Sequence, residues 1–376
     1  MSIQEIVCLK GNNMTNQHYF AYGSNINNAE FEQWCISRGY PPQLLKFVGR
    51  ASLRDFELAF SYRSSSRRGG VLDIRERRGS VVPGVVFEVD SEGWEALDEK
   101  EGAPGCYQRE DVVVFDESGE KYRAITYRVS ADRTQSYVAP APGYVEIVQL
   151  GLESWKIGDT HMLAAAKNES LPCPNGFFFY GTLMRGESRF DVLKRYGIEC
   201  VLLAETQGRL FDLGLFPGMT HDNSSGSEVR GEFVRLRNPE AALAALDVIE
   251  GFRGYGQTGS LFRREQIQVY VGDGRFRAAW AYRLEASSDD SQIISSGDWR
   301  QHCGSRELFL RRLAEAHSKK SSQAIAERLA AMSPYSWNGQ HRDVVESLLP
   351  LDGALGTGLL SERKLAQATG QWTVIP

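Results

Sequence analysis

An internal repeat constrains this sequence more than any other feature, because the same parts occur twice in the same order. The run HYFAYGSN at residues 18–25 is echoed by GFFFYGTL at residues 176–183. Farther along each half, WEALDEKEG at residues 94–102 is echoed by AALDVIEG at residues 244–251. Alternating apolar runs, typical of strands, precede and follow both LDxxEG segments. This ordered set predicts two domains of one fold.

The length of 376 residues exceeds what one hydrophobic core usually supports. We expect the first domain at residues 16–166 and the second at 176–302, joined by the polar, proline-containing segment KNESLPCPN. Residues 303–376 include SRELFLRRLAEAH and SQAIAERLAAM, in which apolar residues recur at helical spacing. We expect this helical C-terminal extension to pack on a neighbouring domain or to bind a protein partner.

Short alternating apolar runs dominate each repeat and are bounded by Gly, Asp and Ser. Helical patterns are fewer and are predicted around residues 28–38, 92–101, 144–166 and 239–250. The sequence therefore predicts α+β domains, each a mainly β barrel or curled sheet with flanking helices.

Charge and composition narrow the class of protein. The net charge of −5 gives no reason to expect nucleic acid or an anionic membrane as a partner. No apolar run reaches the roughly 18 residues of a spanning helix, and the amino terminus shows no secretory signal. The six cysteines are scattered and no histidine lies at metal-ligand spacing, so we expect neither a disulfide framework nor a metal site. A cytoplasmic protein without a cofactor is the resulting expectation.

The ordered motifs resemble a known family. FAYGSN, GRASLRDFELAF, LDEKEG and PAPGYVEIVQLGLESWKIGD make the first domain similar to the γ-glutamylcyclotransferases. YGTL, FDLGLFPGM, VRGEF and LDVIEG make the second similar to the branch of γ-glutamylamine cyclotransferases and AIG2-like proteins. The resemblance covers residues 18–285 and implies a small γ-glutamyl substrate (an amino acid, an amine or a γ-glutamylated product) that is cleaved with release of 5-oxoproline.

This reaction requires no enzyme nucleophile, metal or water, because the α-amine of the substrate attacks its own γ-carbonyl. The protein must hold the two groups in near-attack geometry and move a proton from the amine to the leaving nitrogen. By their position in the family motif, Glu101 and Glu250 are the candidate proton shuttles. The alternative interpretation is that each simply precedes a helix-ending glycine, Gly102 or Gly251.

The resemblance also assigns substrate binding to two corresponding loops. In the first domain the loop residues are Tyr22, Gly23, Ser24 and Asn25, and in the second they are Tyr180, Gly181, Thr182 and Leu183. Tyr107 and Tyr144 match tyrosines near the pocket of the family. A packing role is the alternative for Tyr22, Tyr107 and Tyr144.

The second domain departs from the first immediately after its glutamate. The insertion FRGYGQTGS follows Glu250, so that Phe262 occupies the position of Tyr107, and Tyr255 is an alternative source of a hydroxyl. Besides a pair of enzymes, a catalytically silent tandem scaffold and a chain with one catalytic and one binding domain remain open.

Six arginines gather around RRGGVLDI: Arg63, Arg67, Arg68, Arg75, Arg77 and Arg78. A solvated hairpin is the simpler interpretation of this cluster. Because Gly69 and Gly70 match a glycine pair near the pocket of the family, the alternative is that one arginine recognises an acidic substrate or partner.

Overall fold

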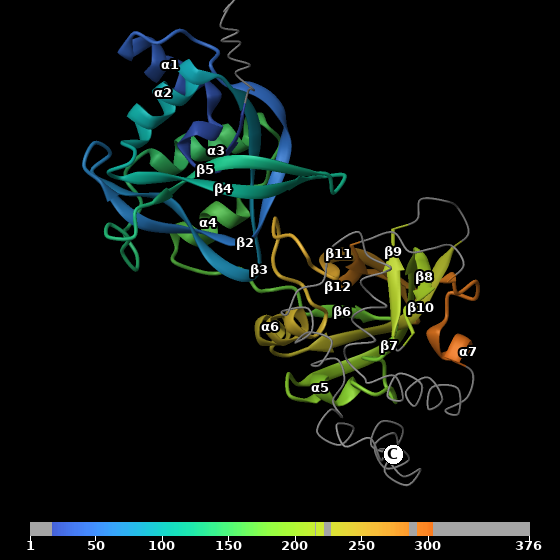
Figure 1. The fold of residues 1–376 in the computed structure, drawn as a ribbon. Coiled ribbons are helices and arrows are strands. Elements are labelled where there is room, and N and C mark those ends of the chain that lie inside the picture. The colour runs from blue at the N-terminus through green and yellow to red at the C-terminus, as the bar shows by residue number, and fades with distance from the viewer. Residues whose placement is uncertain (1–16, 215, 222–226, 286–291, 304–376) are drawn as a thin grey trace, which may run out of the picture. The chain divides into compact units, whose positions relative to one another are not determined.

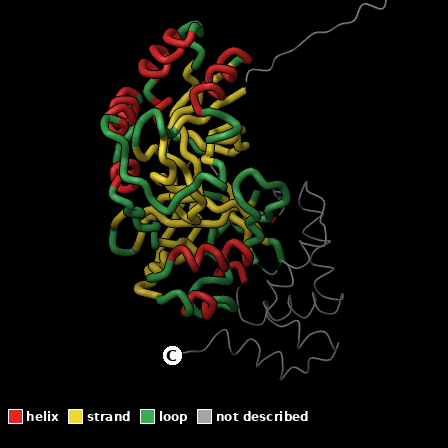
Figure 2. The backbone as a smooth tube through the Cα atoms, turned by 90° about the vertical axis from the view of Figure 1, so that its left-hand side faces the viewer, coloured by secondary structure: helices red, strands yellow, loops and turns green. Residues whose placement is uncertain are grey.

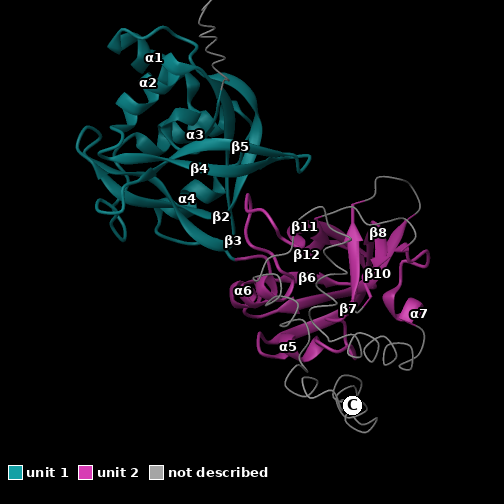
Figure 3. Cartoon of the chain, viewed as in Figure 1, with its two compact units in different colours: residues 1–172 teal, residues 173–376 magenta. Residues whose placement is uncertain are grey.

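The computed structural model describes residues 17–214, 216–221, 227–285 and 292–303, and the chain divides into two compact units, 1–172 and 173–376 (Figure 3). The division falls within KNESLPCPN. Of the extension predicted for residues 303–376, all but Cys303 lies outside the described residues. In the described part of the chain, no helix has the length and apolar character needed to cross a membrane.

The first unit is a five-stranded closed barrel with helices around it (Figure 1). Its strands are β1 (Gln17–Ala21), β2 (Lys46–Ser64), β3 (Gly69–Val89), β4 (Tyr107–Asp116) and β5 (Lys121–Val129). Its helices are η1 (Ser24–Ile26), α1 (Asn28–Arg38), α2 (Ser91–Glu101), α3 (Tyr144–Ser154) and α4 (Thr160–Ala166). Large side chains such as Phe20, Phe60 and Phe87 fill the core.

The second unit is also a closed five-stranded barrel, with an additional two-stranded sheet. The barrel strands are β6 (Gly176–Phe179), β7 (Ile198–Gln207), β10 (Glu228–Leu236), β11 (Phe262–Val271) and β12 (Arg275–Leu284). The small sheet pairs β8 (Arg209–Asp212) with β9 (Pro217–Thr220), and the helices are α5 (Phe190–Lys194), α6 (Pro239–Ile249) and α7 (Trp299–Cys303).

The two barrels have the same topology. The strand order around the first is β1-β3-β2-β4-β5, and the order around the second, β6-β10-β7-β11-β12, matches it position by position. Each closes through one parallel contact, Tyr19 with Ile125 and Phe177 with Trp280. Within each unit the helices lie outside the barrel strands (Figure 2). The predicted fold class, α+β with two barrel domains and flanking helices, is confirmed.

The predicted helices at 28–38, 92–101 and 239–250 correspond to α1, α2 and α6 within one residue. The prediction of one helical segment at 144–166 was wrong in its continuity, since α3 ends at Ser154 and α4 begins at Thr160. Lys156 adopts a left-handed φ of 56°, and Trp155 donates its indole N–H to the Ile26 carbonyl oxygen at 2.7 Å. The chain turns here to bring Trp155 against the end of η1, and this long-range contact has no signal in the helical spacing.

Candidate active sites

The first motif forms the loop after β1. Tyr22 donates its hydroxyl hydrogen to the carbonyl oxygen of Tyr127 at 2.6 Å, so this buried tyrosine joins the loop to β5. A Cβ atom at Gly23 would lie 3.3 Å from the Tyr144 hydroxyl oxygen, which is tighter than most such contacts. Ser24 and Asn25 follow in η1. The glycine therefore permits a close approach between this loop and Tyr144.

Glu101 is the last residue of α2, and Gly102 caps the helix with a left-handed φ of 62°. The side-chain amide of Asn25 donates a hydrogen bond of 2.7 Å to Oε1 of Glu101 and one of 3.0 Å to the Tyr19 hydroxyl oxygen. Gly102 therefore ends the helix, as the capping interpretation predicts, and Glu101 in the same segment also contacts the loop. The structure brings the LDEKEG and YGSN motifs, which are 76 residues apart at Asn25 and Glu101, into direct contact.

The electrostatic surroundings of Glu101 suit proton exchange at neutral pH. Burial raises the pKa of Glu101 to about 7, although the charges of Lys100 and Arg67 and the hydrogen bond from Asn25 act in the opposite direction. A general acid–base group is most effective when its pKa lies near the working pH.

Glu101 lines a cavity of about 510 Å³ in the first unit. The wall includes every predicted site residue of this domain: Tyr22, Gly23, Ser24, Asn25, Glu101, Tyr107 and Tyr144. The Tyr107 hydroxyl donates to the Leu72 carbonyl oxygen at 2.8 Å, and the Tyr144 hydroxyl accepts from the Leu72 N–H at 3.3 Å. One residue of β3 therefore fixes both tyrosine rings, so they shape the wall as well as line it.

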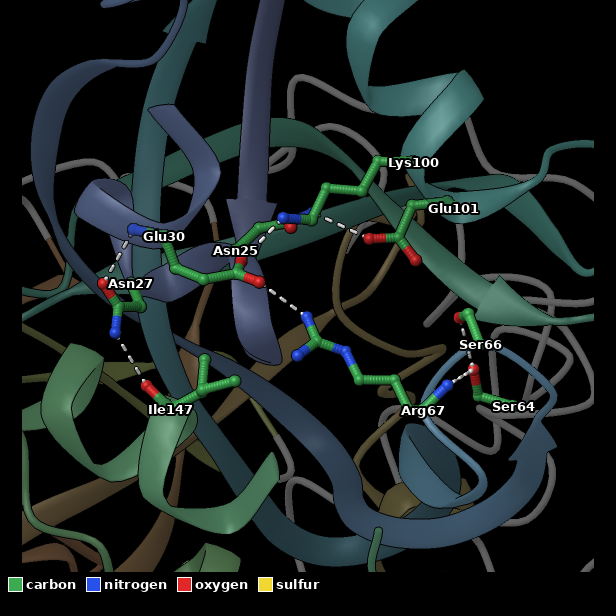
Figure 4. A network of polar contacts seen from close by, with 9 residues as sticks. All are labelled: Asn25, Asn27, Glu30, Ser64, Ser66, Arg67, Lys100, Glu101 and Ile147. Carbon is green, nitrogen blue, oxygen red and sulfur yellow. Dashed lines mark hydrogen bonds and ion pairs between the residues drawn. The ribbon is translucent and has the colours of Figure 1, made fainter. Parts of the chain in front are cut away.

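An ion-pair network, formed in part by residues that sequence reasoning missed, closes one side of the cavity. Glu30 of α1 accepts from Arg67 Nη2 at its Oε1 and from Lys100 Nζ at its Oε2, both at 2.7 Å (Figure 4). Arg67 belongs to the turn between β2 and β3, and Lys100 directly precedes Glu101. These two cations lower the pKa of Glu30 despite its partial burial. Lys100 lies inside the LDEKEG motif and was therefore visible, whereas the position of Glu30 on α1 gave no such signal.

The predicted arginine cluster is divided by the structure. Arg67 lines the cavity, whereas Arg75 and Arg77 form ion pairs with Glu57 at 2.6 and 3.0 Å and do not line it. Arg68 is exposed at the tip of the hairpin. The solvated-hairpin interpretation therefore describes part of the cluster, and one arginine, Arg67, reaches the pocket.

A second set of missed residues anchors each LDxxEG helix to its barrel. In the first unit, Asp98 accepts from the Tyr127 hydroxyl at 2.6 Å and from Nε and Nη2 of Arg109 at 2.9 and 2.8 Å. In the second unit, Asp247 accepts from the Tyr282 hydroxyl at 2.7 Å and from Arg264 Nη1 at 2.6 and 2.8 Å. Each aspartate is three residues before the candidate glutamate, so it holds the glutamate-bearing turn in place. The available signals were the repeated tyrosine of ITYRV and WAYRL and the repeated Arg-Glu pair at residues 109–110 and 264–265.

The second unit assembles a corresponding but much smaller site. Glu250 lies at the end of α6 beside Gly251, whose φ is 64°. Its cavity of about 40 Å³ is lined by all the predicted residues of this domain: Tyr180, Gly181, Thr182, Leu183 and Glu250. Burial raises the pKa of Glu250 to about 7, and the positive charge of the buried Arg189 opposes this rise.

Phe262, which corresponds to Tyr107 in the repeat, lines this second cavity as predicted. Tyr255 does not line it. The Tyr255 hydroxyl instead donates to the Arg264 carbonyl oxygen at 3.0 Å. Leu183 replaces Asn25 and has no amide to offer to the glutamate. Phe216 and Pro217 also face the cavity, and the Pro217 ring would lie 2.7 Å from a Cβ atom at Gly181. The two sites thus share a plan but differ in size and polarity.

Across the described ranges, no group of three His, Cys, Asp or Glu side chains has an arrangement that would hold a metal ion.

Two barrels of one topology, each with a Tyr-Gly loop facing a half-buried glutamate, define a protein with tandem domains of the cyclotransferase type. The family model described as "Gamma-glutamyl cyclotransferase, AIG2-like" matches residues 19–144 and again residues 177–301. The chain belongs to this family, and its tandem domains are the two matched segments.

Named relatives agree with this assignment. The chain is 33% identical over 133 residues to the Gamma-L-glutamyl-butirosin B gamma-glutamyl cyclotransferase of Niallia circulans, an alignment that spans 34% of this chain and 77% of that protein. It is 28% identical over 145 residues to the Gamma-glutamylcyclotransferase of Homo sapiens, covering 35% of this chain and 68% of that protein. A solved structure of a gamma-glutamyl cyclotransferase is 25% identical, covers 42% of this chain and 89% of its own, and has a TM-score of 0.35.

Proposed function

We propose that the first unit is a γ-glutamyl cyclotransferase that releases 5-oxoproline from a γ-glutamyl amide. The observation that carries this proposal is the hydrogen bond from Asn25 to Glu101 at the wall of a 510 Å³ cavity. It places a carboxyl group with a pKa of about 7 beside the glycine-containing loop. The volume falls in the range of small-molecule sites in proteins. The names of the two relatives support the same class of reaction.

In the proposed mechanism the protein folds the γ-glutamyl group so that its α-amine faces its own γ-carbonyl carbon. Glu101 takes a proton from the α-ammonium, and the freed nitrogen attacks the carbonyl carbon to close a five-membered ring. The bond from that carbon to the leaving nitrogen then breaks as Glu101 returns the proton to the leaving nitrogen. The ring nitrogen gives up a second proton, which passes through Glu101 to the released amine, so that the products are a lactam with a neutral nitrogen and an ammonium ion. Every atom of the substrate is thus recovered in 5-oxoproline and an amine, with no external reactant.

Ionisation of Glu101 suits both proton transfers. With a pKa of about 7 the carboxyl group is ionised in a substantial fraction of molecules at neutral pH, yet it binds a proton strongly enough to carry it. Gly23 allows the substrate to approach the backbone N–H groups of the loop, which stabilise the negative charge that develops on the carbonyl oxygen.

The test is 5-oxoproline release, measured by mass spectrometry, from a panel of γ-glutamyl amino acids and amines. Glu101→Gln keeps the shape of the side chain but removes the base, so turnover in the first unit should fall roughly 10²–10⁴-fold. Glu95→Gln, at an exposed position of the same helix, is the matched control. The proposal fails if the unmodified protein releases no 5-oxoproline from any compound, or if Glu101→Gln turns over normally in a Glu250→Gln background.

A further inference from the structure

One wall of the first cavity extends beyond the residues that would hold the γ-glutamyl group. This wall, which we call the charged wall, consists of Glu30, Trp34, Ser64, Ser65, Ser66, Arg67 and Lys100. Its residues come from α1, from the penultimate residue of α2, and from the end of β2 with the turn that follows it. If Glu101 contacts the reacting nitrogen atoms, the remaining space beside the charged wall is where the leaving group lies.

The charged wall carries more positive than negative charge. Arg67 and Lys100 share the single carboxylate of Glu30, and all three side chains are largely shielded from solvent, with exposures of 27%, 7% and 25%. Glu99 is farther out and has partners of its own in Arg38 and the Tyr40 hydroxyl. Within the charged wall two cations face one carboxylate, and both cations also lower the pKa of the neighbouring Glu101. In this partly desolvated place Arg67 and Lys100 attract a further anion.

Arg67 has the donors to bind that anion. Only its Nη2 donates to Glu30, while Nε and Nη1 have no acceptor among the described residues. The backbone N–H of Arg67 donates to Ser64 Oγ at 3.2 Å, and its guanidinium carbon lies 5.6 Å from the centre of the Tyr144 ring. Figure 4 shows the Arg67 side chain extending from the turn to Glu30, and Arg67 and Glu101 both line the cavity. A guanidinium fixed in this way is suited to paired hydrogen bonds with a carboxylate.

We propose that Arg67 selects the leaving group of the first unit by binding a carboxylate on the leaving amine. This inference rests on the proposed function of the same site. Lys100 keeps Glu30 neutralised while Arg67 directs its remaining donors to the substrate. The described residues that line the second cavity include no lysine or arginine, and Phe216 and Pro217, which follow β8, line it instead. We therefore expect no such selection in the second unit.

The alternative target for Arg67 is the α-carboxylate of the glutamyl group itself. Two substrates separate these possibilities: γ-glutamylalanine and γ-glutamylethylamine have the same glutamyl group, and their leaving amines differ only by one carboxylate. An arginine that binds the leaving group affects the first compound alone. One that binds the glutamyl group affects both equally.

The experiment compares Arg67→Gln with Arg68→Gln in the full chain carrying Glu250→Gln. Arg68 is exposed at the same turn and does not line the cavity, so its replacement removes the same charge without touching the site. We expect Arg67→Gln to lower kcat/KM for γ-glutamylalanine about 10- to 100-fold, the range of one hydrogen bond between charged groups. Both values are measured at a pH well above the pKa of Glu101, because loss of the Arg67 charge raises that pKa and would otherwise affect both substrates. For γ-glutamylethylamine the change should then stay below about 3-fold, and Arg68→Gln should change neither value. Arg67→Lys keeps the positive charge but not the planar guanidinium with its paired donors, so it should lower kcat/KM for γ-glutamylalanine by an intermediate factor.

Equal losses on both substrates, or no loss on either, would overturn the inference. Failure of the proposed function gives a different result, namely no 5-oxoproline from either compound with the unmodified protein. In that event calorimetric binding to Glu101→Gln still decides the role of Arg67. Tighter binding of γ-glutamylalanine than of γ-glutamylethylamine, lost in the added Arg67→Gln variant, supports the inference, and equal binding of the two compounds contradicts it.

Discussion

The side-chain amide of Asn25 donates to Oε1 of Glu101 at 2.7 Å, which joins the loop after β1 to the last residue of α2. This bond favours the charged form of the carboxyl group and so lowers its pKa, against the larger effect of burial. In the second unit the matching residue is Leu183, which cannot donate such a bond. The pair therefore tunes the glutamate of the first unit in a way that the second does not share.

Asn25→Leu should move the pH profile of the first unit to higher pH. Because the base must be ionised, kcat/KM is expected to rise with pH through an apparent pKa near 7. Removal of the hydrogen bond destabilises the ionised form, so this rise should shift upward by about one unit. The measurement is kcat/KM from pH 5 to 9, with Asn28→Leu, an asparagine outside the cavity, as the control. A profile that stays in place would show that the bond does not act on the catalytic base.

Glu101→Gln should stabilise the first unit at pH 8 more than at pH 5. The pKa of Glu101 is raised in the folded state from 4.5 to about 7, so ionisation destabilises that state as pH rises from about 4.5 to 7. The neutral glutamine avoids this cost while its Oε1 still accepts from Asn25. After a discount for partial exposure, the gain at pH 8 is about 1–2 kcal/mol, or a rise in Tm of roughly 2–8 °C. Calorimetric melts at both pH values test it, and an equal change at the two values would contradict the assigned pKa.

The repeat allowed the sequence to predict both barrels and to name corresponding candidate residues, which line the two cavities. Tyr22 and Tyr180 occupy the same place in their units, each donating its hydroxyl hydrogen to a carbonyl oxygen of the last barrel strand at 2.6 Å. The order of the motifs was sufficient to predict this correspondence, because a repeated local pattern brings the same pair of elements together in each unit. The break between α3 and α4 was not predictable, since it depends on the contact of Trp155 with Ile26, 129 residues away.

The size and charge of the two cavities could not be predicted from the sequence either. Glu30 and Arg67 are 37 residues apart and meet because the tertiary structure places the turn between β2 and β3 beside α1. The sequence identified the arginines as a group, but it could not tell Arg67, which lines the cavity, from Arg75, which pairs with Glu57. Patterns of single residues identify candidates, whereas partners are set by the tertiary structure.

Asp247→Asn should destabilise the second unit far more than Asp98→Asn destabilises the first. The Arg264 side chain that pairs with Asp247 is fully buried, with ring centres of Phe252 and Trp280 at 5.0 and 5.4 Å from its guanidinium carbon. Removal of its charged partner leaves a buried cation, at a cost of about 3–5 kcal/mol. Asp98 and Arg109 are more than one-third exposed, and their pair should contribute about 1 kcal/mol or less.

Differential scanning calorimetry of the full chain measures both variants, each followed through the transition of its own unit. The Asp98→Asn variant acts as the internal control, because it removes the matching carboxylate charge from an ion pair that is more exposed to solvent. Similar costs for the two variants would mean that burial of Arg264 does not determine the energy of this pair.

The last prediction concerns the division of chemistry between the units. Both contain a half-buried glutamate with a pKa of about 7, but their cavities of about 510 and 40 Å³ differ more than tenfold in volume. Phe216, Pro217 and Phe262 narrow the second cavity and make its wall apolar, and Pro217 packs directly against Gly181 of the loop. The second site therefore should not admit the substrates that the first one accepts.

We expect Glu101→Gln to lower the turnover of γ-glutamyl amino acids roughly 10²–10⁴-fold. Glu250→Gln should leave this turnover within about 2-fold of the value for the unmodified protein. The check is 5-oxoproline release from one substrate panel for both single variants and the double variant. Single variants that each lose half of every activity would show the units to be redundant. A double variant that keeps full activity would exclude both glutamates as proton shuttles. Turnover that depends on Glu250 alone would reverse the assignment, because it would mean that the smaller cavity opens to admit substrate while the larger one does not support the reaction.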